Sequence, residues 1–462
     1  MEVITPKMRI LKMKWLIAVP LLLAGTFLTL RPAAAQSSQR ITLEDALRLG
    51  LQNSKTLKLS QAKIDEAEAR YKQAADQQLP TIKASAMGSG AYIPTHKIQI
   101  KGLMEEPVYL PRTTVMYIGT FAVEKAIFAG HKLRYAKTSA DLLKKIAGLN
   151  ADRDKDDILF NIVSAYINLY KIDQNLKIIA QNLDDVQGRL EETQNFEEQG
   201  LATLNDVLRF KLEKSNVELT RIELENNRKV ANYALAILLG LPDDSTKIEV
   251  DSIQADPHDV QPLDAYLQEA LRSRKDLATY NYQNQLTDIS IRNINADKLP
   301  TLGVGANVYY VNPNSQFIPP ANSFLIPMTL GLNLSWNISS LYTSKHKVAE
   351  QEVKKREVEI GKSAASDQIR IDVNRDYRAY QQTLDKIKVL QTAVEQAAEN
   401  DRIMESKYRN QLATTTDRID AQTLLYQSKV NLALARADAE IAYYNLLKST
   451  GTIAATGAAA QP

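Results

Sequence analysis

The sequence has no cysteine among its 462 residues, which excludes disulfide staples and thiolate metal sites. It also excludes the acylated cysteine of a bacterial lipoprotein. Glycine and proline are scarce, at 17 and 16 residues, which disfavours turn-rich sandwiches and propellers. The four histidines are isolated, and no HExxH, GxSxG or P-loop motif occurs. We therefore expect no metal site, no cofactor and no enzyme.

The N-terminus carries the only long apolar run. Basic residues from Lys7 to Lys14 precede the apolar stretch Trp15–Leu30, and the small residues Ala33–Ala35 follow it. This pattern predicts a cleaved signal peptide over residues 1–35. A membrane anchor is the alternative, but the run is shorter than the ~20 residues that a spanning helix needs. Without this segment the chain is close to neutral, so no nucleic-acid partner is indicated.

The rest of the chain is a duplication. Three short segments of the first half recur in the second half in the same order: Leu43–Leu47 in Leu263–Leu267, Leu79–Thr81 in Leu299–Thr301, and Leu201–Thr203 in Leu412–Thr414. Several ordered matches at nearly constant spacing indicate a repeat. The predicted segments are a first repeat at 36–240, an inter-repeat linker at 241–262, a second repeat at 263–451 and a disordered tail at 452–462.

Each repeat changes its periodicity in the same order. A helix comes first, at 43–78 or 263–298, and a Leu-Pro-Thr segment ends it because proline cannot continue a helix. Alternating segments then predict strand pairs at about 80–125 and 300–337. Proline next disappears, and apolar residues spaced alternately four and three apart predict long coiled-coil helices at about 133–240 and 343–450. The fold class is α+β and mostly α.

The predicted strands are long enough to cross a bilayer, but four of them cannot close a barrel, because the smallest spanning barrels have about eight. An open sheet in lipid would leave backbone N–H and C=O groups unpaired. Several chains must therefore share one barrel if the strands lie in a membrane. The alternative is a water-exposed sheet that caps the helices. Aromatic residues near the strand ends favour the membrane: Tyr92, Tyr117, Tyr309, Tyr310 and Trp336.

The layout resembles the TolC-like outer-membrane efflux protein family over about residues 41–451. The resemblance rests on the double repeat, the Leu-Pro-Thr segments, and the two segments 199–208 and 412–421, each followed by a helix that ends at Gly240 or Gly451. It implies a homotrimer in which three chains form a 12-stranded β-barrel in outer-membrane lipid, continued by a periplasmic α-barrel. Such channels work with a periplasmic adaptor (membrane fusion) protein and an inner-membrane pump, and they carry out no reaction.

The function implied by the resemblance is passive efflux of small molecules, such as drugs and toxic compounds, from the periplasmic pump to the exterior. Type I protein secretion and metal export use the same architecture, and the sequence does not separate them from drug efflux. A periplasmic coiled-coil scaffold that never enters a membrane is the alternative from a different class. Such a scaffold would be a soluble monomer without detergent.

The resemblance also implies functional residues at the two helix tips. Asp417 and Asp420 fall on the positions of an acidic pair that lines the pore constriction, where threefold symmetry would build a cation-selecting ring. The alternative is two solvated acids on a helix face. Tyr408 and Asp206 match positions that help to close the entrance. An arginine of the family falls on Ala413 here, and either Arg409 or Arg418 is a candidate to replace it.

The turns between the paired helices are predicted to contact the adaptor, since their residues are mostly small and polar. The alternative is that they are only tight turns. The predicted contact residues are Gly200, Leu201, Ala202, Thr203, Leu412, Ala413 and Thr414.

Overall fold

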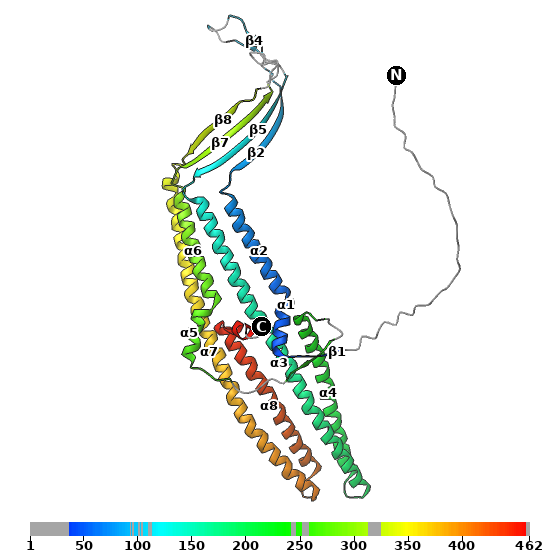
Figure 1. Cartoon of the computed structure of the whole chain (residues 1–462). Coiled ribbons are helices and arrows are strands. Elements are labelled where there is room, and N and C mark those ends of the chain that lie inside the picture. Colours follow the sequence, from blue (N-terminus) through cyan, green and yellow to red (C-terminus); the bar gives the residue numbers. More distant parts are fainter. Residues whose placement is uncertain are drawn as a thin grey trace, which may run out of the picture.

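The structure is a computed structural model in which long helices carry a β-sheet at one end (Figure 1). It describes residues 37–458, apart from 93, 95, 96, 100, 101, 103, 104, 110–112, 242–245, 252–257 and 313–324. The predicted signal peptide and the last part of the predicted tail, 459–462, lie outside the described residues.

The sheet has four antiparallel strands in the order β2-β5-β7-β8. They are β2 (Thr81–Tyr92), β5 (Thr113–Phe128), β7 (Thr301–Asn312) and β8 (Met328–Ser335). A small hairpin, β3 (Lys97–Ile98) with β4 (Val108–Tyr109), extends beyond the sheet. Within the described residues, β2 and β8 each pair on one side only, so the chain leaves both edges of the sheet open.

Four long helices form two antiparallel hairpins. They are α3 (Lys132–Glu198), α4 (Leu204–Leu239), α7 (Ser340–Arg409) and α8 (Thr415–Thr450). At 1.5 Å per residue, the 67 residues of α3 extend for about 100 Å. Five apolar residues of α3 that follow the predicted coiled-coil spacing are buried: Ile162, Leu169, Ile179, Val186 and Leu190.

The helix that opens each repeat is broken, contrary to the prediction of one continuous helix. The first copy consists of α1 (Leu43–Asn53) and α2 (Lys55–Asp76), and the second of α5 (Leu263–Ser273) and α6 (Lys275–Ala296). At Ser54 the backbone leaves the helical conformation, and the Ser54 hydroxyl accepts a hydrogen bond from Leu57 N, which caps the new helix. The break lets Asn53 donate to Leu239 O at 2.7 Å, at the end of α4.

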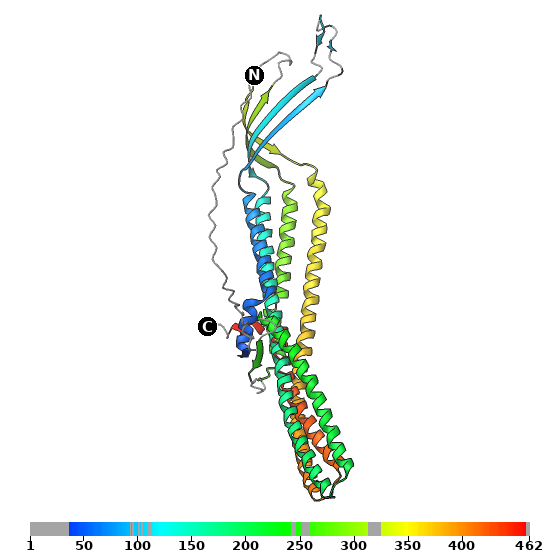
Figure 2. The same ribbon diagram turned by 90° about the vertical axis from the view of Figure 1, so that its right-hand side faces the viewer.

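The helices keep one lateral order along the whole molecule. In the half next to the sheet the order is α2, α3, α6, α7, which is also the order of the strands that these helices continue. In the far half α4 and α8 take the places of α2 and α6 on either side of α3. Two views at right angles show these rods side by side as an elongated body (Figures 1 and 2).

The inter-repeat linker is partly a strand. Strand β6 (Thr246–Val250) pairs in parallel with β1 (Ser37–Ile41) near the middle of the helices. Tyr166 of α3 fixes this ribbon, because its hydroxyl donates to Ile41 O and accepts from Asp251 N, each at 2.9 Å. Burial raises the pKa of Tyr166 to about 12, so the hydroxyl remains a donor at any physiological pH.

The prediction of a disordered tail is wrong for its described part. Residues Ile453–Ala458 form helix α9, and Ile453 is 1% exposed. Its side chain belongs to the same core as Ile41, Leu239 and Ile248. The burial of an apolar side chain explains why this part of the tail is ordered.

Candidate functional site: a two-faced sheet and two helix tips

One face of the sheet is apolar and the other is polar. Because cross-strand partners lie on the same face, the register carries each row across all four strands. Two neighbouring apolar rows are Ile82, Val123, Ala306 and Leu330, and Ala84, Phe121, Val308 and Met328. A polar row between them is Lys83, Ala122, Asn307 and Thr329.

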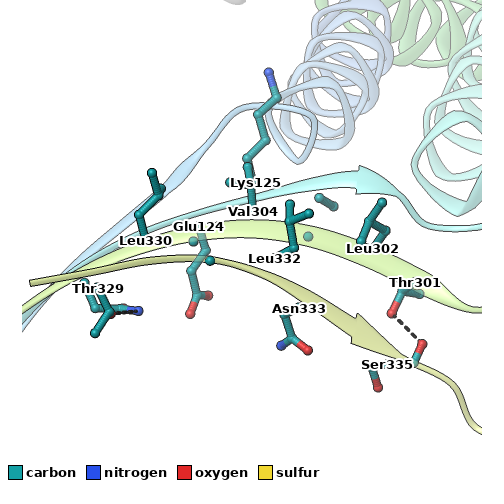
Figure 3. Close-up of a pocket in the computed structure, with 15 residues that line it drawn as sticks. Glu124, Lys125, Thr301, Leu302, Val304, Thr329, Leu330, Leu332, Asn333 and Ser335 are labelled. Atoms are coloured by element: carbon teal, nitrogen blue, oxygen red, sulfur yellow. Dashed lines mark hydrogen bonds between the residues drawn. The ribbon is translucent and has the colours of Figure 1, made fainter.

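Figure 3 shows this division directly in the half of the sheet next to the helices. The side chains on one side are Lys125, Leu302, Val304, Leu330 and Leu332, and those on the other are Glu124, Thr301, Thr329, Asn333 and Ser335. On the polar face, Gly303, Gly305 and Gly331 carry no side chain, and residues of this part of the sheet line a hollow of about 460 Å³. Such a sheet suits an apolar medium on one side and water on the other.

Aromatic residues of the apolar face lie at both ends of the strands. Tyr92, Tyr117 and Tyr310 lie toward the end far from the helices, in the rows that continue the apolar positions of their strands. Phe128, paired with Leu302, and Trp336, which follows β8, lie at the helix end. Tyr309 belongs instead to a polar row with Ser85 and Thr120.

The two helix tips have the same turn geometry. Gly200 and Gln411 each adopt a left-handed backbone conformation, with φ of 74° and 58°. In each turn the next amide bonds back to the preceding helix: Leu201 N to Phe196 O at 2.7 Å, and Leu412 N to Lys407 O at 2.8 Å. This is the Schellman arrangement, which ends a helix within one turn. Leu412 is 77% exposed at its tip; adaptor contact by these turns remains a prediction.

Both predicted functional aspartates at the third helical position are capping residues. The Asp417 carboxylate accepts from Thr414 N at 2.9 Å and from the Thr414 hydroxyl at 2.7 Å. Asp206 makes the same two bonds with Thr203, at 3.0 and 2.6 Å. The sequence prediction missed this capping box, although its Thr-x-x-Asp spacing was visible. The Thr414 hydrogen bonds lower the pKa of Asp417.

Asp206 also reaches the other repeat. Burial raises the pKa of Asp206, but hydrogen bonds from the Thr203 and Thr415 side chains outweigh it, so the net pKa is lowered. One turn further along, Arg209 donates to the Thr416 hydroxyl at 2.6 Å. The start of α4 is therefore tied to the start of α8. Asp420 is exposed one turn after Asp417.

Tyr408 packs into the tip rather than bonding to Asp206. Its ring lies edge-on to Phe210, with centroids 6.5 Å apart, and its hydroxyl lies 3.3 Å from the Thr193 hydroxyl. The buried residues Leu190 and Val207 complete this apolar cluster. Tyr408 thus joins α7 to both α3 and α4.

A charged cluster lies just above the tip, and the sequence prediction identified only part of it. Arg418 is 4% exposed, and it donates to Asp401 at 2.5 Å and to Glu405 at 2.9 Å. Glu405 also pairs with Arg189 of α3, and with Arg409 at 2.7 Å. Burial raises the pKa of Glu405, but the charges of Arg189 and Arg418 outweigh it and the net pKa is lowered.

Both arginines considered as replacements for the missing family arginine therefore bind Glu405. Only the Glu405–Arg409 spacing, one helical turn, was readable in the sequence. The pairing with Arg189 depends on how α3 and α7 pack.

Among the described residues, no helix has both the length and the apolar composition needed to cross a membrane. The same part of the chain contains no group of three or more histidine, aspartate or glutamate side chains that could hold a metal ion.

The open two-faced sheet and the helical rods define a protein whose sheet suits contact with lipid on one face. A sequence model of the outer membrane efflux protein family matches residues 46–241 and 266–452. Since these residues are most of the sequence, the chain belongs to that family. It is therefore an outer-membrane protein whose helices form a periplasmic extension.

The chain is similar to the outer membrane protein TolC of Escherichia coli K12, with 23% identity over 324 residues. That match covers 68% of this chain and 65% of TolC, so it spans just under two thirds of the relative.

Solved structures show the same fold. The outer membrane protein VceC of Vibrio cholerae superimposes with a TM-score of 0.70 at 17% identity, covering 88% of this chain and 96% of VceC. The outer membrane channel CmeC of Campylobacter jejuni superimposes with a TM-score of 0.72 at 14% identity, covering 89% and 86%. The matched family is thus one of outer membrane efflux proteins, and CmeC is named as a channel.

Proposed function

We propose that three copies of this chain form an outer-membrane channel, which is the passive exit duct of a tripartite efflux system for small toxic molecules. The chain itself catalyses no reaction. A periplasmic adaptor and an inner-membrane pump are the partners, because the channels of this family are homotrimers that work with such proteins. Because the chain belongs to an efflux family, we favour the export of drug-like small molecules over protein secretion.

The observation that carries this proposal is the pair of complementary open edges. One side of the protomer ends in β2, α2 and α4, and the other side ends in β8 and α7. A sheet with lipid on its apolar face cannot leave these edges unpaired. Pairing β8 of one protomer with β2 of the next closes the ring without any new element, and it puts the polar face inside.

Exposed apolar stripes on the same two sides support this closure. On α4 the exposed residues recur at coiled-coil spacing: Leu208, Leu212, Leu219, Ile222, Val230, Tyr233 and Ile237. On α7 they recur at intervals of whole helical turns: Tyr342, Val353, Ile360, Ile371 and Val389. A single chain leaves both stripes in water. In the proposed trimer, α7 of one protomer packs against α2 of its neighbour in the half next to the sheet and against α4 of its neighbour in the far half.

The entrance lies at the tips. Asp417 and Asp420 of three protomers form the constriction ring, and their proximity favours cations. Tyr408 and Asp206 hold the α7–α8 hairpin against α3 and α4, and the Arg189–Glu405–Arg418 cluster strengthens the same contact. Opening the entrance then requires these links to break. The two turns, Gly200–Thr203 and Leu412–Thr414, meet the adaptor.

The proposal is tested by purification and reconstitution. The expected result is extraction only with detergent, a trimer that survives gel electrophoresis unless heated, and discrete conductance steps in a planar bilayer. A monomer that stays in solution without detergent would contradict it and support the scaffold function instead.

A further inference from the structure

The apolar face of the sheet carries a single charge among the described strands, that of Lys125. Lys125 pairs with Val304, and Val304 pairs with Leu332, so the three share a face. Figure 3 shows the Lys125 side chain projecting beyond these apolar neighbours, on the side opposite Glu124. The other strand residues on this face are apolar, aromatic or small and uncharged.

No group of the described chain neutralises this ammonium group. Its sequence neighbour Glu124 lies on the polar face, where its carboxylate is 4.0 Å from Lys83. Asp297, at the end of α6, is paired with Lys132 of α3. Lys125 has no ion pair or hydrogen bond to its side chain within the described residues.

The position of Lys125 along β5 places it near the end of the sheet that joins the helices. It lies three residues before Phe128, the last residue of β5, which is about 10 Å along the strand. Phe128 and Trp336 mark this end with aromatic rings, as residues at a membrane interface do. A lysine at the middle of the lipid face destabilises the protein, whereas near the interface this cost largely disappears because the side chain can reach the headgroups.

We propose that Lys125 binds the phosphate of an anionic phospholipid in the periplasmic leaflet, one lipid for each protomer. Leu302, Val304 and Leu332 provide the apolar surface on which the acyl chains of that lipid lie. This inference rests on the proposed function, because it needs the apolar face of the sheet to meet lipid. Lipid phosphate is favoured over free phosphate because the surface around Lys125 is apolar.

The test uses full-length trimers reconstituted into vesicles of phosphatidylethanolamine and phosphatidylglycerol. After extraction, native mass spectrometry counts the phosphatidylglycerol that each trimer retains. Lys125→Leu is expected to retain about fivefold less, the factor for one basic side chain at an anionic bilayer surface. Lys125→Arg keeps the charge and should retain the lipid. Lys83→Leu removes a lysine from the polar face and is the matched control.

Equal retention by the wild type and Lys125→Leu would overturn the inference. So would displacement of the lipid from the wild type by inorganic phosphate, since the ligand would then be a free anion. Trimer formation and bilayer conductance are measured on the same samples. If the wild type forms no conducting trimer, the proposed function fails; if it conducts and lipid retention does not depend on Lys125, only the lipid site fails.

Discussion

Arg189 of the first repeat and Glu405 of the second form an ion pair that joins α3 to α7 just above the tips. Arg418 binds the same carboxylate from α8. Glu405 therefore connects three helices, α3 of the first repeat with α7 and α8 of the second. This arrangement makes the helix contact at the proposed entrance electrostatic rather than purely apolar.

Removing the Glu405 charge should loosen this contact. Glu405→Gln leaves Arg189 with Glu192 alone and leaves the buried Arg418 with Asp401 alone. Breaking such a buried pair costs about 3 kcal/mol. We expect a lower unfolding temperature by circular dichroism and more frequent opening in single-channel recordings. Glu399→Gln is the matched control, because its pair with Arg402 is exposed and contributes little. Identical unfolding temperatures and identical opening frequencies for both variants would exclude a role for the charged cluster in holding the entrance closed.

The acidic ring is tested at Asp420 rather than at Asp417 alone. Asp417→Ala removes a carboxylate and also the capping box with Thr414, so a change in conductance would have two explanations. Asp420→Ala removes only charge. We expect it to weaken block by divalent cations at least several-fold in planar bilayers, with no change in helix content. Unchanged block in both single variants and in the double variant would place the constriction elsewhere.

Glu440 makes the stability of the helices depend on pH. It is buried on α8, where it faces His258 of the linker at 3.2 Å and lies among Tyr380, Tyr443 and Tyr444. Burial raises the pKa of Glu440 above the ordinary value of 4.5, and the His258 charge only partly opposes this. A folded-state pKa that is raised contributes stability at low pH, and this contribution is lost as the pH rises through that pKa.

Glu440→Gln removes this titration. We expect the variant to be more stable than the wild type at pH 8, and the difference to disappear near pH 4, as measured by thermal unfolding at each pH. A variant that is less stable than the wild type at pH 8 would show that the pair with His258 outweighs burial. Glu399→Gln again serves as an exposed control.

Gly200 and Gly240 both have a positive φ, but their substitution by alanine should destabilise the protein to different extents. Gly200 has φ of 74°, and a Cβ at this position would meet no other group within 4 Å, so Gly200→Ala should cost about 1 kcal/mol from backbone strain alone. Gly240 has φ of 69°, and a Cβ there would lie 2.5 Å from Asn53 Cβ. Gly240→Ala should therefore cost several-fold more in urea unfolding. Equal costs would mean that α1 does not pack against the end of α4.

Much of the fold could be predicted because its signals are local. The segments predicted as strand pairs became β2, β5, β7 and β8, and the proline-free stretches became α3, α4, α7 and α8. Besides the two capping boxes, three features were missed: the breaks at Ser54 and Arg274, the helix Ile453–Ala458, and the Arg189–Glu405 pair. Each depends on residues from distant parts of the chain, so no local sequence pattern predicts it.

The sequence by itself determined which segments are helices and strands and that they occur twice, since side-chain period, proline and helix caps act within a few residues. Only the tertiary structure decided the lateral order of the strands and the sharing of one carboxylate by three arginines. It also decided that Lys125 is the only charged residue of the described strands on the apolar face. These follow from strand register and helix packing, which bring together side chains that the sequence keeps far apart.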